Sequence, residues 1–209
     1  MRRLYIIPII HSRHDLGSLE QPVYEQKRRQ LSEAAIESSR VAVDAFWFGL
    51  QNGIASWNLD YANAVVFQDA LPFTGHPDRI IEHKIVEELA AKGSANHKLV
   101  KWLIDQGARL EGTESSELLL KEYEAVRKAL ANGFAAYDEP STDRSSGHTL
   151  LIQRDRFIAN RISESLCGVQ KFGLLFLGML HRVEDYLTQD IQVEYPFGRL
   201  KSDAALQQH

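Results

Sequence analysis

Residues 171–185 read KFGLLFLGMLHRVED. They hold a strongly apolar run at 172–180, which stops at His181 and is followed at once by charged residues. A membrane-spanning helix needs about 20 apolar residues, so a run of this length is typical of a strand buried in a core. The stretch therefore predicts a buried strand with a histidine at its carboxyl end.

The N-terminal residues repeat this arrangement. An apolar run at 4–10 is followed by His11 and then by Ser12-Arg13-His14-Asp15. Because the imidazole titrates near pH 6.5 when unperturbed, such a histidine can act as a general base, or as a metal ligand when neutral. The alternative for each histidine is a partly buried side chain that bonds only to a backbone carbonyl.

Strand-like segments alternate with long helical segments along the chain. Besides the two apolar runs, strands are predicted at 62–67, 108–111 and 190–195, the last near a sheet edge, and a polar loop at 137–147. Apolar residues at helical spacing predict helices between the strands, including one long helix over 22–51. Parallel strands need a crossover, which a helix supplies. We therefore expect a single α/β domain over 1–200, with a mainly parallel central sheet flanked by helices, and a frayed tail at 201–209.

Composition narrows the classes of partner. The 209 residues carry a formal net charge of −4, which gives no general attraction to nucleic acid or to anionic membranes. The single cysteine, Cys167, cannot form an internal disulfide, and no secretory cleavage site follows the first apolar run. We expect a cytoplasmic protein that acts on a small molecule or a peptide. A homodimer is one option, because the helix at 22–51 has apolar residues around much of its circumference.

Candidate site residues follow several of the predicted strands. In parallel sheets, binding groups gather beyond the carboxyl ends of the strands, where the sequence places His11, Asp69, Glu111, Glu114 and His181. Either glutamate could polarise a histidine, hold a metal ion or act as a base. The alternative is that Glu114 interacts with the positive N-terminus of the next helix.

Arg154 is the remaining candidate. It could bind a substrate carboxylate or phosphate through paired hydrogen bonds, or it could pair with Asp155 at the surface. The sequence contains no Gly-x-Ser-x-Gly elbow, no glycine-rich phosphate loop and no dinucleotide fingerprint. Cys167 falls within a predicted helix core, so hydrolysis by this chain would use an activated water.

Three segments together resemble a known superfamily. They read Pro8-Ile9-Ile10-His11, Arg154-Asp155-x-x-Ile158-Ala159-x-x-Ile162 and Gly178-Met179-Leu180-His181. The pattern is similar to that of the superfamily of TraB and Tiki proteins, erythromycin esterases and ChaN-type proteins. Its members share two Gly-x-x-His motifs with an acidic residue and an arginine between them. In this chain Pro8 stands in place of the first motif's glycine.

The resemblance implies an α/β domain in which the two histidines face each other. Members include metal-dependent peptidases and esterases, and ChaN-type proteins linked to haem binding. For this chain, the resemblance implies that His11 and His181 are bases or metal ligands. It also implies Glu111 or Glu114 as the acidic partner, and Arg154 as an anion clamp. We expect a hydrolase that activates water against an ester or amide, with or without a divalent metal on His11, His181 and Glu114. The alternative is a non-catalytic protein that binds a small ligand or haem through the same histidines.

Overall fold

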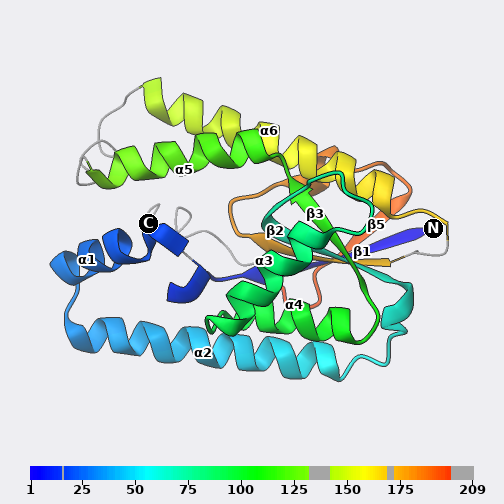
Figure 1. Cartoon of the computed structure of the whole chain (residues 1–209), viewed down its shortest axis with the longest axis horizontal. Coiled ribbons are helices and arrows are strands. Elements are labelled where there is room, and N and C mark those ends of the chain that lie inside the picture. Colours follow the sequence, from blue (N-terminus) through cyan, green and yellow to red (C-terminus); the bar gives the residue numbers. More distant parts are fainter. Residues whose placement is uncertain (16, 132–141, 169–171, 199–209) are drawn as a thin grey trace, which may run out of the picture.

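The computed structural model describes residues 1–15, 17–131, 142–168 and 172–198 (Figure 1). Within these ranges, five strands form one sheet of order β3-β2-β4-β1-β5, and every neighbouring pair is parallel. The strands are β1 (Arg2–Ile9), β2 (Ala64–Pro72), β3 (Arg109–Glu114), β4 (Phe172–Gly178) and β5 (Ile191–Glu194). The predicted α/β fold with a parallel central sheet is confirmed, and β5 lies at an edge as predicted.

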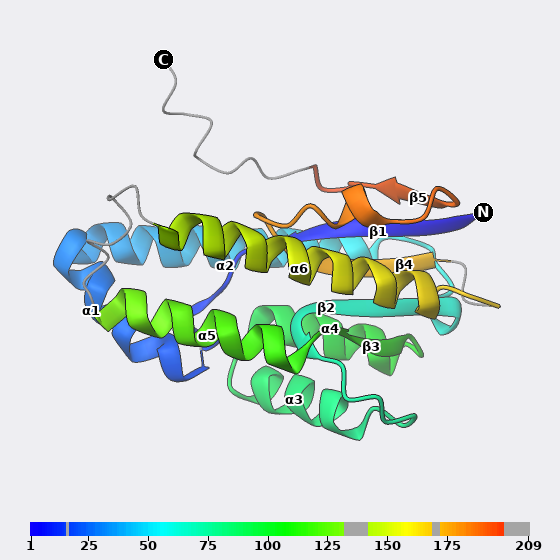
Figure 2. The same ribbon diagram turned by 90° about the horizontal axis from the view of Figure 1, so that it is seen from above.

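Helices cover both faces of the sheet. In the described part of the chain they are α1 (Glu20–Gln30), α2 (Glu33–Ala55), α3 (Ile80–Ala91), α4 (Ala95–Asp105), α5 (Ser116–Ala131) and α6 (Thr142–Ser165). Side chains of α2, α3 and α4 pack on one face, and those of α6 pack on the other. Helix α5 runs beside α6 (Figures 1 and 2). None of the described helices is both long and apolar enough to cross a membrane.

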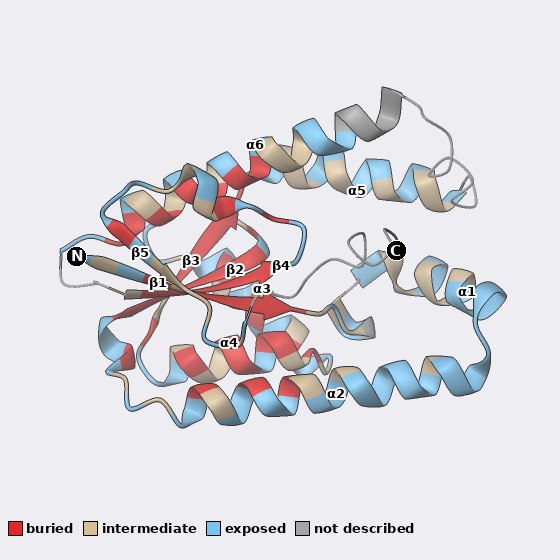
Figure 3. Cartoon of the chain, turned by 180° about the vertical axis from the view of Figure 1, so that it is seen from behind, coloured by how far each residue is buried: buried red, intermediate tan, exposed pale blue. Residues whose placement is uncertain are grey.

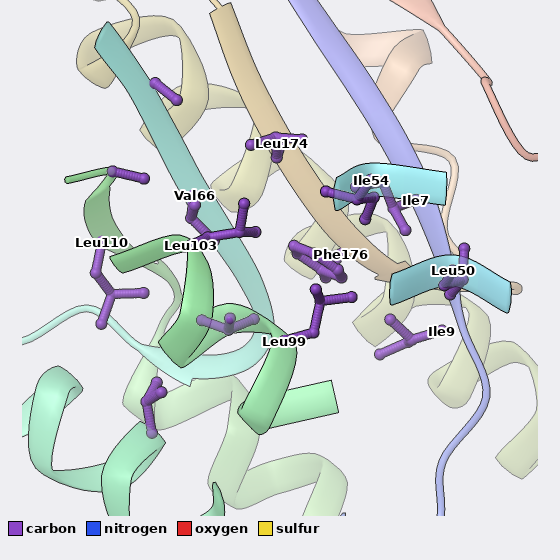
Figure 4. Close-up of a cluster of buried hydrophobic side chains, with 14 of the residues drawn as sticks. Ile7, Ile9, Leu50, Ile54, Val66, Leu99, Leu103, Leu110, Leu174 and Phe176 are labelled. Carbon is purple, nitrogen blue, oxygen red and sulfur yellow. The ribbon is translucent and has the colours of Figure 1, made fainter. Parts of the chain in front are cut away.

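Alternate side chains of the three central strands, β1, β2 and β4, enter two separate hydrophobic clusters. On one face Ile7 and Phe176 pack with Leu50 of α2 and with α4 (Figure 4). On the other face Phe67 packs with Ile162 of α6. Strands that are buried on both faces are apolar at nearly every position, which explains the continuous apolar runs at the two ends of the sequence.

Two predicted boundaries differ from the structure. The helix expected over 22–51 is two helices, because Ser32 caps α2 by accepting a hydrogen bond from the Ala35 backbone N–H at 3.2 Å. Serine favours this capping position over the helix interior. Helix α6 begins at Thr142, so part of the loop predicted at 137–147 is helical. Residues 137–141 of that loop, and the predicted frayed tail at 201–209, lie outside the described residues.

Two pairs of helices extend beyond the carboxyl edge of the sheet. Figures 1 and 3 show α1 with the first half of α2 on one side, and α5 with the first half of α6 on the other. They are linked just before α1, where the Ser18 hydroxyl lies 3.1 Å from the Tyr123 hydroxyl of α5. The carboxyl ends of the strands therefore point toward the space flanked by these helices.

Candidate active site

Five buried polar side chains meet at the carboxyl edge of the sheet. They are Asp69 on β2, Glu114 on β3, Arg154 and Asp155 on α6, and His181 after β4, and none is more than 7% exposed. We call these five residues the polar cluster. Burying charged groups is costly unless they are paired, and each member has a partner within the cluster or beside it.

Arg154 is the centre of the cluster. Its Nη2 donates to Glu114 Oε1 at 2.6 Å and to Asp69 Oδ1 at 3.0 Å. Its Nε donates to Glu114 at 3.2 Å, and its Nη1 donates to Glu122 on α5. The guanidinium therefore neutralises acids of the protein itself. The sequence-based expectation was an anion clamp for a substrate, but most of these donors are already engaged.

His181 is oriented by Asp155. Its Nδ1 lies 2.5 Å from Asp155 Oδ1, and the second carboxylate oxygen accepts a hydrogen bond from the Arg182 backbone N–H at 3.0 Å. A proton on Nδ1 satisfies this contact and leaves Nε2 as the basic nitrogen. Nε2 lies 3.6 Å from Asp69 Oδ1. The imidazole is thus held in one orientation between two carboxylates.

From the sequence, Asp155 is expected only as a surface partner of Arg154, yet the residue is buried and binds His181. A signal for this was present. Asp155 precedes the buried Ile158, Ala159 and Ile162 at spacings of three, four and seven, so it continues the inward face of α6. An acid on the buried face of a helix needs a polar partner.

Asp69 lies at a local irregularity in the backbone of β2. The next residue, Ala70, has φ of 61°, and the pairing of β2 with β3 shifts between Gln68 and Pro72. Asp69 Oδ2 accepts a hydrogen bond from the Gly178 backbone N–H at 2.9 Å. Burial alone would raise the pKa of Asp69, but the charges of His181, Arg154 and His11, with this hydrogen bond, lower it.

The pKa values of Glu114 and His181 are both raised, although burial acts on them in opposite directions. Burial raises the pKa of Glu114 to about 7, against the opposing effect of Arg154 and with a further contribution from Asp69. Burial alone would lower the pKa of His181, but the hydrogen bond to Asp155 and the charge of Asp69 outweigh it, so that pKa is raised. The cluster therefore changes its proton content around neutral pH.

His11 approaches the same carboxylate from the other end of the chain. It is exposed, whereas His181 is buried, and its charge helps to lower the pKa of Asp69. The turn that follows it is held by Asp15, which accepts hydrogen bonds from the Ser12 N–H at 2.6 Å and from the Ser94 hydroxyl. Ser94 in turn caps α4. The segment that carries His11 is therefore anchored to α4.

Glu111 belongs to a different group of side chains. Its carboxylate forms ion pairs with Arg79, Arg109 and Arg161 at 2.5, 2.8 and 3.4 Å. Arg161 lies two helical turns after Arg154 on α6, so the two predicted glutamates bind different arginines along one helix. Of the two, Glu114 is the one that joins His181.

The cluster offers donors for a metal ion. Ligand atoms of Asp69, Glu114 and His181 all lie within 4.8 Å of one another. Imidazole and carboxylate ligands suit zinc, manganese or iron, and metal-bound histidines usually donate their other N–H to an acid, as His181 can to Asp155. Arg154 already donates to Asp69 and Glu114, so a bound cation would compete with the guanidinium for these oxygens.

Comparisons of the chain with protein-family models, with curated proteins and with solved structures found no match.

Proposed function

We propose that the chain is a hydrolase in which His181, oriented by Asp155, activates water for attack on an ester or amide. The supporting observation is the buried contact of 2.5 Å between His181 Nδ1 and Asp155 Oδ1. A carboxylate in this position fixes the tautomer of the histidine and stabilises the imidazolium that forms when Nε2 takes a proton. The resemblance to erythromycin esterases and TraB-type proteins is consistent with this chemistry.

In the proposed reaction, a water molecule gives a proton to His181 Nε2 while its oxygen bonds to the substrate carbonyl carbon. The imidazolium then donates that proton to the leaving oxygen or nitrogen, and the carbon–leaving-group bond breaks. His11, exposed at the end of β1, is the donor that we assign to the carbonyl oxygen. Arg154 has a positioning role, because it holds Asp69 and Glu114.

The charge of the site favours certain substrates. Asp69, Glu114 and Glu122 all bind Arg154, and Asp155 binds His181. An anionic group close to these acids would be repelled, more strongly because most of them are buried. The proposed substrate is therefore neutral or cationic near the bond that is cleaved.

A second candidate is the metal-assisted form of the same reaction. It is supported by the close approach of ligand atoms of Asp69, Glu114 and His181. A divalent ion held there would supply Lewis-acid chemistry, while Asp155 would orient the histidine ligand. Elemental analysis of the purified protein distinguishes this form. Stoichiometric zinc, manganese or iron, lost on changing Asp69→Asn together with activity, would favour it over the metal-free reaction.

The primary test is a panel of p-nitrophenyl esters and amides assayed with three variants. We expect His181→Ala to lower kcat/KM by about 10²–10⁴-fold. His148→Ala, which removes an exposed histidine of α6, is the matched control and should leave the rate unchanged. Arg154→Lys tests separately whether Arg154 acts by positioning Asp69 and Glu114. Full activity in the His181 variant would refute the mechanism.

The non-catalytic alternative has its own signature. Both ring nitrogens of His181 face carboxylates, at 2.5 and 3.6 Å, which favours a base over an axial haem ligand. We expect the purified protein to show no Soret band. A Soret band that disappears in His181→Ala or His11→Ala would support the haem-binding alternative instead.

A further inference from the structure

A pocket adjoins His181 on the side of the sheet where β5 ends. It is a shallow recess open to solvent, and the space inside it and at its mouth together comes to about 340 Å³. Its lining combines apolar and polar groups from β1, from β4 and from the segments after β4 and β5: Ile6, Pro8, Leu177, Met179, His181, Glu184 and Tyr195. His181 is thus a member of both the polar cluster and the pocket wall.

The pocket exists because β5 is short. Its pairing with β1 runs only from Arg2 to Tyr5, so the following residues of β1 have no neighbouring strand on that side. Pro8, which lacks a backbone N–H, lies in this unpaired part and leaves no donor unsatisfied there. Ile6 and Leu177, 5% and 4% exposed, contribute apolar surface. The result is a recess beside the proposed base whose floor is apolar and whose wall also carries polar groups.

We propose that this pocket binds the short, uncharged acyl group of the substrate, an inference that rests on the proposed hydrolase. The histidine that activates water forms part of its wall, so a carbonyl group at His181 can direct its acyl chain between the ends of β1 and β4. The apolar members of the lining, among them Ile6, Leu177 and Met179, offer contacts for a short hydrocarbon chain. The acids of the polar cluster disfavour a chain that ends in a carboxylate.

The two methionines of the chain make a direct binding test available. They are Met1 and Met179, and only Met179 lines the pocket. Protein labelled with ¹³C at the methionine methyl groups is titrated with acetone, 2-pentanone and levulinate, which are carbonyl compounds that cannot be hydrolysed. We expect the Met179 methyl resonance to shift most with 2-pentanone, less with acetone and least with the anionic levulinate.

The matched control for this titration is Leu180→Met. Leu180 is 66% exposed and does not line the pocket, so its replacement places a second reporter next to the pocket but outside it. The new methyl resonance should stay in place while that of Met179 moves. Equal shifts at both positions, or no shift at Met179, would overturn the inference without any need for turnover.

A kinetic test separates this inference from the proposed function. Met179→Trp should lower kcat/KM for p-nitrophenyl butyrate about tenfold more than for the acetate, because the larger side chain fills the recess. Leu180→Trp should leave the ratio unchanged. If His181 is required but the chain-length ratio does not respond to Met179, the pocket assignment is wrong. If His181→Ala keeps full activity while 2-pentanone still shifts Met179, the catalytic mechanism is wrong and the pocket stands.

Discussion

His181 and Asp155, 26 residues apart in the sequence, are joined by a contact of 2.5 Å between Nδ1 and Oδ1. This contact raises the pKa of His181 against the effect of burial. A raised pKa means that the neutral, basic form is lost at a higher pH than usual as the solution is acidified. In the proposed reaction, the rate falls on the acid side through a pKa above the ordinary 6.5 of histidine.

Asp155→Asn tests this relationship. An amide cannot stabilise the imidazolium as a carboxylate does, so kcat should fall by several orders of magnitude, up to about 10⁴-fold. The pKa of His181 should fall as well, because the hydrogen bond that raises it is weakened. The acid limb of the kcat/KM profile should therefore move to lower pH. An unchanged limb would show that Asp155 does not set the protonation of the base.

Arg154→Met should destabilise the protein strongly. The change leaves Asp69 and Glu114 buried without their shared counter-ion, and removal of one partner from a buried ion pair costs about 3–5 kcal/mol. Urea denaturation measures the free energy of unfolding. Arg156→Met is the control, since Arg156 is exposed and stacks on the Tyr186 ring at 5.3 Å. Adding Glu114→Gln to Arg154→Met should recover part of the loss, and the absence of recovery would contradict the pairing.

Ala70 should tolerate glycine unusually well. Its φ of 61° lies in the left-handed region, which costs a non-glycine residue about 1–2 kcal/mol. Glycine relieves this cost but has a more flexible unfolded state, so Ala70→Gly should change the free energy of unfolding by less than about 1 kcal/mol. Ala70→Val should destabilise by about 1–3 kcal/mol, because a β-branched residue fits this conformation poorly.

The comparison for Ala70 is Ala42→Gly in the exposed interior of α2, which should cost about 1 kcal/mol as in an ordinary helix. Thermal or urea unfolding measures all three variants. A larger loss for Ala70→Gly than for Ala42→Gly would contradict the assigned backbone conformation.

The turn after His11 should stabilise the fold less in acid. Burial alone would raise the pKa of Asp15, but the hydrogen bonds from His97, Ser94 and Ser12 lower it to about 2. A lowered folded-state pKa gives stability that is present above the unfolded-state value of 3.8 and is lost as the pH falls toward 2. The contribution is about 2 kcal/mol. Asp15→Asn should remove this part of the acid dependence, measured as the free energy of unfolding between pH 5 and pH 2. If the dependence of that free energy on pH is the same in the variant, Asp15 is not its source.

The sheet could be predicted because its central strands are apolar on both faces. The runs at 4–10 and 172–180 leave few other interpretations, and the observed strands β1 and β4 overlap them closely. The break between α1 and α2 was missed because it depends on one capping hydroxyl, that of Ser32, within a sequence of otherwise helical spacing.

The candidate site was only partly predictable. Strand ends indicated His181 and Glu114, but the choice between Glu111 and Glu114 depends on geometry that the sequence does not contain. Positions three apart face opposite sides of a regular strand. Both glutamates nevertheless bind arginines of α6, next to an irregularity in the pairing of β2 with β3. Such a bulge has no simple sequence signal.

Arg154 joins segments that are distant in the sequence. Its partners Asp69, Glu114 and Glu122 lie 85, 40 and 32 residues away. Contacts of such high sequence separation are slow to form during folding, because long loops must close first, and the pairing of β2 with β4 closes a still longer loop. The polar cluster draws on β2, β3, α6 and the segment after β4, so it should be complete only when these strands have paired and α6 has docked. Catalytic competence and completion of the native state would then be a single event, so that partly folded chains carry no activity.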